Sequence, residues 1–250
     1  MGTIFFCGDP HGHFNHIIKA VRDHRPAAVI LLGDQQALRS LEIELVEIIS
    51  LTEIWWIPGN HDTDSESDYD NLFHSKLSDR NLHSRVVEIA GIRIAGLGGV
   101  FRSKVWMPQD NPEFESPAEY LKKCGKGNHW RGGLPLKHRS TIFPNEYFGL
   151  IGERADVLIT HDAPGAHPYG SDLISDLARN LGIGNQRLLK SFHGHQHDSL
   201  KYPAQEGFRP YGVGLRGITS LDTETWEIEI IRPGEQDAQR QQHREKMVSK

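Results

Sequence analysis

Five short polar segments, each placed directly after an apolar run, constrain the fold of this chain more than any other feature. Each segment contains Asp, Asn or His, the side chains that bind divalent cations through oxygen and nitrogen. The pattern predicts five strands that deliver these side chains at their C-terminal ends. In open α/β sheets, ligands bind at that end of the strands. The segments are Gly8–Gly12, Gly33–Asp34, Gly59–Asp62, Thr160–Asp162 and Gly194–His197.

The apolar runs before these segments are short enough to be strands. Ala27–Leu32 is continuously apolar, which is typical of a strand covered on both faces of its sheet. Asp9, Asp34 and Asn60 lie about 25 residues apart, which leaves room for a helix between successive parallel strands. The sequence therefore predicts a β-α-β-α-β start. The five predicted strands are Thr3–Cys7, Ala27–Leu32, Glu53–Pro58, Asp156–Thr160 and Leu188–His193.

Apolar residues at helical spacing predict helices between and after these strands. From Ser191 onward the pattern is strand and turn, and we expect antiparallel pairing there. Together these elements predict an α/β protein. The predicted helices are Phe14–His24, Leu38–Ser50, Pro144–Arg154 and Ser171–Leu181, and the further strands are Arg85–Ala90, Ile92–Gly96, Leu200–Tyr202, Tyr211–Leu215, Gly217–Leu221 and Thr225–Ile231.

The domain organisation follows from where the regular pattern of predicted strands and helices ends. Residues 1–232 are predicted to form one domain. Within it, residues 100–143 have no clear period and are interpreted as an insertion with a short helix near Pro117–Lys123. A long irregular insertion in a compact domain is often a lid or a binding loop. Residues 233–250 are polar and predict a frayed helix or a disordered tail.

Charge and cysteine content exclude some classes of protein. The 250 residues carry a formal net charge of -5, with a pI near 6.3. This balance disfavours a broad nucleic-acid surface but leaves a local basic strip open. Cys7 and Cys124 are too few for a disulfide framework. No apolar run approaches the roughly 18 residues of a membrane span. The N-terminus resembles no export signal. We therefore expect a cytoplasmic protein without a membrane segment, and the sequence does not indicate its oligomeric state.

The order Asp-x-His, Gly-Asp, Gly-Asn-His-Asp, His, Gly-His-x-His resembles that of the calcineurin-like metallophosphoesterases. The resemblance extends from Phe6 to His197. It implies a fold of two β-sheets packed face to face with helices on the outside. It also implies a centre of two cations that share Asp34. Carried over residue by residue, the ligands of one cation are Asp9, His11, Asp34 and His197, and those of the other are Asp34, Asn60, His161 and His195.

Such a centre suits the hydrolysis of phosphate esters. Two cations about 3.5–4 Å apart activate a shared water and neutralise charge that develops on the phosphate oxygens. Mixed imidazole, amide and carboxylate ligation fits Mn²⁺, Fe or Zn²⁺ better than Mg²⁺, and we expect Mn²⁺. The predicted substrate is a small phosphorylated metabolite, a nucleotide or a phosphodiester.

His61 is the candidate proton donor. It follows the ligand Asn60, and a histidine near its ordinary pKa can protonate a leaving alkoxide. We expect Asp62 to accept a hydrogen bond from the other ring nitrogen of His61 and so fix its tautomer. The alternative interpretation is that Asp62 only caps a following turn.

Departures from the family pattern narrow the prediction. Phosphoprotein phosphatases of this family have Asp-Arg-Gly after the second motif and Gly-Asn-His-Glu at the third. This chain has Gln36-Ala37-Leu38 and ends the third motif with Asp62. The missing arginine disfavours a protein phosphatase. A nuclease remains an alternative on the same fold, and a non-catalytic metal-bound interaction module is an alternative of another class.

Candidate substrate-binding residues lie in the insertion and after the fourth motif. The segment between residues 101 and 140 contains eight basic and four acidic residues. It also contains two tryptophans, which offer surfaces for stacking on a base or sugar. We expect this segment to contribute to specificity, although a solvated surface loop pinned by its tryptophans is the simpler alternative. The candidate residues are Arg131, Arg139, His167 and Tyr169.

Overall fold

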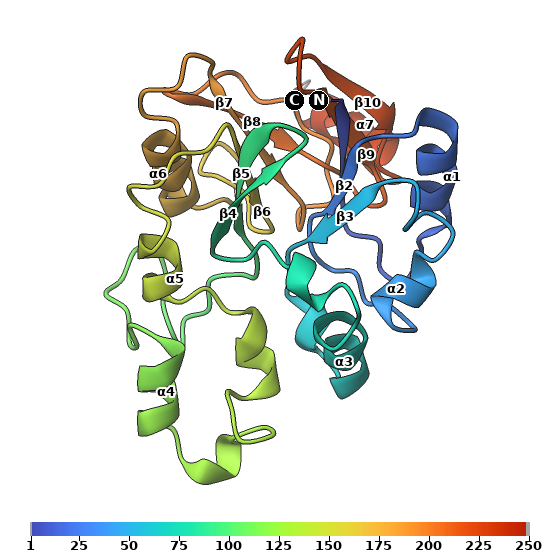
Figure 1. The fold of residues 1–250 in the computed structure, drawn as a ribbon. Coiled ribbons are helices and arrows are strands. Elements are labelled where there is room, and N and C mark those ends of the chain that lie inside the picture. The colour runs from blue at the N-terminus through green and yellow to red at the C-terminus, as the bar shows by residue number, and fades with distance from the viewer. Residues whose placement is uncertain (1, 249–250) are drawn as a thin grey trace.

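Two β-sheets of five strands each form the centre of the molecule (Figure 1). A computed structural model describes residues 2–248, with side chains described as far as residue 242. The first sheet has the order β10-β9-β1-β2-β3; β1, β2 and β3 run parallel, and β9 is antiparallel to both of its neighbours. Its strands are Thr3–Cys7 (β1), Ala28–Leu31 (β2), Glu53–Trp56 (β3), Ile218–Asp222 (β9) and Ile228–Arg232 (β10).

The second sheet has the order β4-β5-β6-β7-β8. Strands β5 to β8 run parallel, and β4 pairs antiparallel with β5 after a tight turn. Both sheets therefore direct the C-terminal ends of several parallel strands to one edge. The strands are Arg85–Ile89 (β4), Ile92–Leu97 (β5), Val157–Thr160 (β6), Leu189–His193 (β7) and Phe208–Gly212 (β8).

The two sheets pack face to face through a shared apolar layer. Phe6 of β1 stacks on Phe192 of β7 with ring centroids 3.8 Å apart, and both side chains are fully buried. Ile30 and Ile159 belong to the same buried cluster. Full burial of one such side chain contributes about 1.5–3 kcal/mol. The predicted α/β fold of two packed sheets is therefore confirmed.

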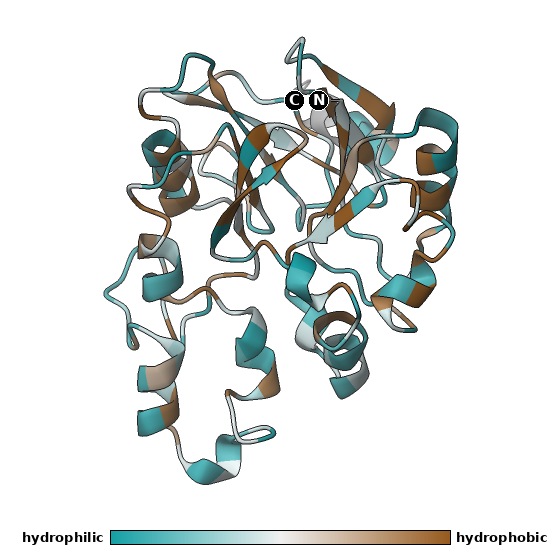
Figure 2. Ribbon diagram, viewed as in Figure 1, coloured by the Kyte–Doolittle hydropathy of each residue, from teal (hydrophilic) through white to brown (hydrophobic). Residues whose placement is uncertain are grey.

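Helices cover the outer faces of the sheets. Because successive strand residues point to opposite faces, Phe5 and Cys7 face away from the other sheet and pack with α1 (Asn15–His24). On the second sheet, Leu158 packs with α6 (Asp172–Leu181). Figure 2 shows hydrophobic residues concentrated in the strands. None of the helices within residues 2–248 combines the length and apolar character needed to cross a membrane.

The remaining helices lie outside these layers. The helix α4 falls within the insertion where the sequence predicts it, and α7 occupies most of the polar tail. Short 3₁₀ turns follow the third motif and end the insertion. The bounds are Leu41–Glu44 (α2), Glu66–Phe73 (α3), Pro117–Lys123 (α4), Pro144–Phe148 (α5) and Asp237–Val248 (α7), with 3₁₀ helices at His61–Thr63, Ser78–Arg80, Lys126–Asn128 and Leu136–Ser140.

Two predicted helices are shorter than expected. The segment Leu38–Ser50 is helical only at α2 and then continues as turns. Its β-branched residues are poor helix formers, and Val46 is exposed, so burial does not compensate for low propensity along the whole segment. The helix predicted for Pro144–Arg154 ends at Phe148.

The predicted strand pattern near the C-terminus is wrong at two places. Tyr211–Leu215 was expected to pair antiparallel, but β8 spans Phe208–Gly212 and runs parallel to β7. Leu200–Tyr202 forms no strand, and Lys201 makes only an isolated bridge. The side-chain alternation of a strand is the same in both pairings, so the pattern cannot tell them apart. The path of the loop between β7 and β8 decides the direction.

The stacked pair Phe6 and Phe192 gives a test of how the sheets are joined. Phe192→Ala should lower the free energy of unfolding by about 3–5 kcal/mol, because it removes a large side chain between the sheets. Phe148→Ala makes the same chemical change at a ring that is 56% exposed, and should cost about 1 kcal/mol or less. Urea unfolding of both variants measures these values. Equal losses would contradict packing of the sheets through Phe192.

Candidate metal centre

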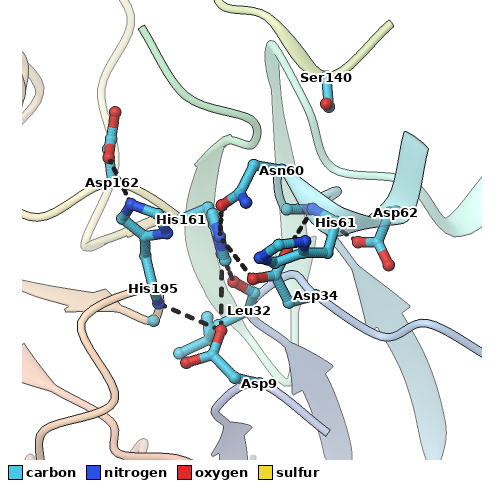
Figure 3. Close-up of polar contacts among 12 residues, drawn as sticks. Asp9, Leu32, Asp34, Asn60, His61, Asp62, Ser140, His161, Asp162 and His195 are labelled. Carbon is cyan, nitrogen blue, oxygen red and sulfur yellow. Dashed lines mark hydrogen bonds and ion pairs between the residues drawn. The ribbon is translucent and has the colours of Figure 1, made fainter. Parts of the chain in front are cut away.

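The polar segments meet at the edge where the parallel strands of both sheets end. Asp9 follows β1, Asp34 follows β2 and Asn60 follows β3, all from the first sheet. His161 and His195 follow β6 and β7 of the second sheet. Figure 3 shows these five side chains directed toward one another. The two sheets thus contribute to a single site.

Two groups of ligand atoms share Asp34. One group is His11, Asp34 and His197, and the other is Asp34, His161 and His195. Within each group, one candidate ligand atom per residue lies within 4.8 Å of the others. His11 Nε2 lies 3.2 Å from His197 Nε2, and His161 Nε2 lies 3.4 Å from Asp34 Oδ2. Each group contains three of the four residues that the sequence predicts for one cation.

Asp9 and Asn60 complete the predicted set at the borders of these groups. Asp9 Oδ1 accepts the backbone N–H of His195 at 3.1 Å and lies 3.7 Å from His161 Nδ1. Asp9 Oδ2 is buried and has no hydrogen-bond partner among the described residues, and it lies 4.0 Å from His197 Nε2. Asn60 Oδ1 lies 3.1 Å from His161 Nε2. All seven predicted ligands therefore lie together.

The backbone at the site is held in an unusual conformation. Positive φ angles, between 36° and 64°, occur at residues other than glycine that are candidate ligands. Each such residue costs free energy, of the order of 1–3 kcal/mol, and persists where the surroundings over-determine it. Strain at this many candidate ligands indicates a site built for function. The residues are Asp9, His11, Asp34, His195 and His197.

Two glycines allow the loops to approach closely. A Cβ atom on Gly59 would lie 2.2 Å from Asp34 Oδ1, and a Cβ on Gly33 would lie 2.2 Å from His161 Nδ1. Gly33 also has φ +102°, which side chains rarely adopt. Glycine at these positions is therefore a condition for placing Asp34 and His161 side by side.

Neighbouring groups orient the imidazoles. Gln36 Oε1 lies 2.6 Å from His11 Nδ1, and the carbonyl of Leu32 lies 2.8 Å from His161 Nδ1. These contacts place a proton on Nδ1 of each ring and leave Nε2 as the candidate ligand atom. Asp162 Oδ1 lies 3.8 Å from His195 Nε2. Sequence reasoning did not assign roles to Gln36 and Asp162, although each is close in sequence to a predicted ligand.

The acidic groups of the site are buried. Burial, with the Asp34 carboxylate adding to it, raises the pKa of Asp9 to about 7. Burial alone favours neutral His161, but the Asp34 carboxylate outweighs this and raises the pKa of His161 to about 10. Burial also raises the pKa of Asp162 to about 6. Positive charge is therefore strongly favoured beside these carboxylates. The oxygen and nitrogen donors and the unpartnered Asp9 Oδ2 fit divalent cations.

His61 lies at the exposed side of the site, and its partner differs from the predicted one. His61 Nδ1 lies 2.5 Å from Asp64 Oδ2, and its backbone N–H donates to Asp34 Oδ1 at 2.8 Å. Burial lowers its pKa, but Asp64 and Asp34 outweigh that effect, and the net shift is upward. The prediction that Asp62 accepts from this ring is wrong. A 3₁₀ turn starts at His61 and brings the side chain three residues ahead, that of Asp64, alongside it.

Asp62 instead ties two motif loops together. Its carboxylate is buried and accepts the backbone N–H of Gly59 at 2.7 Å and that of Gln36 at 2.9 Å. Burial raises its pKa to about 7. Asp62 therefore fixes the loop after β3 to the loop after β2, which holds Asn60 and Asp34 in register.

The four candidate substrate-binding residues make their described contacts with residues other than the candidate ligands. Arg131 forms ion pairs with Glu66 and Asp70 of α3. Arg139 donates to the hydroxyl of Tyr69 at 2.9 Å. These contacts dock the insertion onto α3.

His167 and Tyr169 contact each other, and the His167 ring also lies near the rings of His193 and Tyr202. His167 is buried, and its Nδ1 accepts the backbone N–H of Tyr169 at 3.1 Å. The side chain of Tyr169 is 82% exposed. No contact among the described residues joins either one to the candidate ligands.

Gly59 gives a test of the metal site that does not change a ligand. Gly59→Ala places a methyl group against Asp34 and should weaken Mn²⁺ binding roughly ten- to a hundredfold, the loss typical of disturbed ligand orientation. Gly127→Ala is the matched control, because a Cβ there meets nothing within 4 Å. Titration with Mn²⁺ measures both affinities. Parent-like binding by Gly59→Ala would show that the site adjusts to the extra atom.

Comparisons with known proteins identify the family of this chain. The sequence model of the calcineurin-like phosphoesterase family matches residues 2–199. An uncharacterized protein of Haemophilus influenzae is 42% identical over 219 residues, which cover 88% of this chain and 94% of that protein.

Among solved structures, a 5'-nucleotidase of Candida albicans is similar with a TM-score of 0.48 at 14% identity, over 88% of this chain and 48% of that one. A phosphatase of Mycoplasma pneumoniae is similar with a TM-score of 0.45 at 14% identity, over 97% of each chain. The family assignment comes from the sequence model and not from these distant structures. This chain belongs to the calcineurin-like phosphoesterase family and is a phosphoric ester hydrolase.

Proposed function

We propose that the protein hydrolyses phosphate esters at a centre of two divalent cations, with Mn²⁺ as the preferred metal. The observation that carries the proposal is the pair of ligand groups that share Asp34. The groups consist of imidazole nitrogens and carboxylate oxygens, which favours Mn²⁺, Fe or Zn²⁺ over Mg²⁺. When bound, a cation pair lowers the pKa of water and neutralises charge developing on the phosphate.

Contacts within the protein fix the positions and orientations of the side chains at this proposed centre. Asp34 belongs to both groups, so one carboxylate relates the two positions. Gln36 and the Leu32 carbonyl hold the rings of His11 and His161 in fixed orientations. Strained backbone at the candidate ligands keeps them directed inward before substrate arrives. The site is therefore preorganised for both cations and phosphate.

His61 is proposed to donate a proton to the leaving group. Asp64 occupies its Nδ1, and no described residue hydrogen-bonds to its Nε2. The ring centroid of His61 lies 5.7 Å from that of the candidate ligand His11, so the His61 ring borders the proposed centre. An upward-shifted pKa keeps a larger fraction of the ring protonated near neutral pH. Asp64 acts as a positioning residue in this scheme.

The substrate is proposed to be a small phosphorylated metabolite, a nucleotide or a phosphodiester. Where protein phosphatases of the family carry Asp-Arg-Gly, this chain has Gln36-Ala37-Leu38 and no arginine, and Gln36 orients His11. This contact supports the distinction from protein phosphatases. A non-catalytic module has no need of a complete ligand set together with a positioned His61.

Metal dependence is the first test. Exhaustive chelation should abolish hydrolysis of p-nitrophenyl phosphate, and Mn²⁺ should restore it better than Mg²⁺. Asp34→Asn should lower bound metal and turnover together, because Asp34 belongs to both ligand groups. Asp79→Asn is the control at a side chain that is 76% exposed. Metal analysis and steady-state rates provide the readouts, and full activity after chelation would disprove the two-cation mechanism.

A second test separates proton donation from metal binding. His61→Ala should retain its metals but lose on the order of 10²–10⁴ in kcat on alkyl phosphates, whose leaving groups need a proton. Nitrophenyl phosphate should lose much less. Asp64→Asn should show the same selective loss in smaller degree, whereas Asp62→Asn should not favour one leaving group. Equal losses on both substrates for His61→Ala would contradict a role as proton donor.

A further inference from the structure

Arg102 is held beside the candidate metal centre by contacts on both sides of it. Just before it, Val100 bridges to Thr141, and the Phe101 N–H donates to Asp162 Oδ2 at 3.1 Å. Asp162 directly follows the candidate ligand His161 and is shown with it in Figure 3. The backbone that leads into Arg102 is therefore fixed to the loop of the fourth motif.

The chain after Arg102 turns back at once. The Arg102 carbonyl accepts the backbone N–H groups of Val105 and Trp106, each at 2.8 Å. Trp106 is buried, and its ring lies edge-on to Phe101 with centroids 5.3 Å apart. The turn leaves little freedom in where the Arg102 side chain starts. Its position is set by the core of the domain and not by a free loop.

The guanidinium of Arg102 has no protein partner. Among the described residues it forms no hydrogen bond or ion pair, and its Nε is buried and unsatisfied. Arg131 and Arg139, in the same insertion, both have such partners. Leaving a buried donor unpaired is costly, so this arrangement indicates a ligand that accepts hydrogen bonds.

The charges that act on Arg102 come from the site itself. Burial lowers its pKa, and three carboxylates oppose that effect: Asp64, Asp162 and Asp34. Asp64 is the partner of His61, Asp162 lies against His195, and Asp34 belongs to both ligand groups. These three acids surround the proposed reaction centre. Together with the hydrogen bond between the Phe101 N–H and Asp162, these charges put the unpaired Arg102 side chain on the side of the site that carries these acids.

We propose that Arg102 binds the phosphate group undergoing hydrolysis and makes the site selective for phosphomonoesters. The inference rests on the proposed function and names its substrate class. A terminal phosphate offers three non-bridging oxygens and up to two negative charges, whereas a diester offers two oxygens and one charge. The planar guanidinium matches a pair of phosphate oxygens. With two cations nearby, Arg102 supplies a contact for the oxygen that a diester lacks.

Arg102 is not the arginine of the protein-phosphatase motif. That arginine would lie directly after the second motif, where this chain has Gln36-Ala37-Leu38, whereas Arg102 lies at the start of the insertion. In this proposal the first turn of the insertion contributes the guanidinium group of Arg102 to the site. The arginines further along the insertion, Arg131 and Arg139, contact α3 instead.

The experiment compares Arg102→Ala and Arg102→Lys with the parent, all loaded with Mn²⁺. Lys104→Ala is the matched control, because it removes the same charge from an exposed residue of the same turn. The first readout is the affinity for inorganic phosphate, measured by calorimetry. The second is kcat/KM on p-nitrophenyl phosphate and on bis(p-nitrophenyl) phosphate, which release the same leaving group. Metal content and thermal unfolding verify that each variant is intact.

Arg102→Ala should weaken phosphate binding roughly ten- to a hundredfold, the loss of a charge-assisted contact. It should reduce kcat/KM on the monoester by a similar factor and change the diester less than about threefold. Arg102→Lys should retain part of the binding, and Lys104→Ala should match the parent.

Parent-like phosphate binding by an intact Arg102→Ala would overturn the proposal, as would an equal loss in Lys104→Ala. Equal losses on the two esters would overturn the selectivity for monoesters. A parent that binds no phosphate would also disprove it. If the parent hydrolyses neither ester but Arg102→Ala alone loses phosphate affinity, the proposed reaction fails while phosphate binding by Arg102 stands.

Discussion

The buried carboxylate of Asp34 is the contact on which the rest of the site depends. It belongs to both candidate ligand groups, accepts the backbone N–H of His61, and lies against the ring of His161. The absence of a side chain at Gly59 allows this approach. One side chain from the first sheet therefore organises groups from both sheets. Displacing it would disturb the other candidate ligands, His61 and the contact between the sheets together.

A site of this kind lowers the stability of the folded state, and apolar burial in the core offsets that loss. Buried acids, strained backbone at the ligands and the unpaired Arg102 all oppose folding. The stacked layer of Phe6 and Phe192 between the sheets offsets these costs with apolar burial close to the strand ends. Cations bound at the proposed centre would add stability, because a ligand that binds only the folded state stabilises that state.

The insertion between β5 and β6 is part of this architecture. Near the end of the insertion, Ser140 Oγ lies 2.6 Å from Oγ1 of Thr63, and Thr63 belongs to the 3₁₀ turn that carries His61. Further out, Trp130 packs edge-on against Tyr69 of α3 with centroids 5.0 Å apart. Exposed ion pairs are weak, so the aromatic contact and the buried hydroxyl pair carry more of this docking than the arginines do. The insertion thus joins the second sheet to the 3₁₀ turn that carries His61.

The sequence by itself determined the ligand types, their order and the strands that carry them, because strand ends and metal chemistry depend on local residue patterns. The seven candidate ligands and the five strands before them could be named without coordinates. The partner of His61, the orienting role of Gln36, the parallel direction of β8 and the unpaired state of Arg102 were decided only by the tertiary structure. Each of these depends on how a turn or loop places groups in space. Residue identity alone does not determine the path of these turns and loops. The packing of the two sheets determines it.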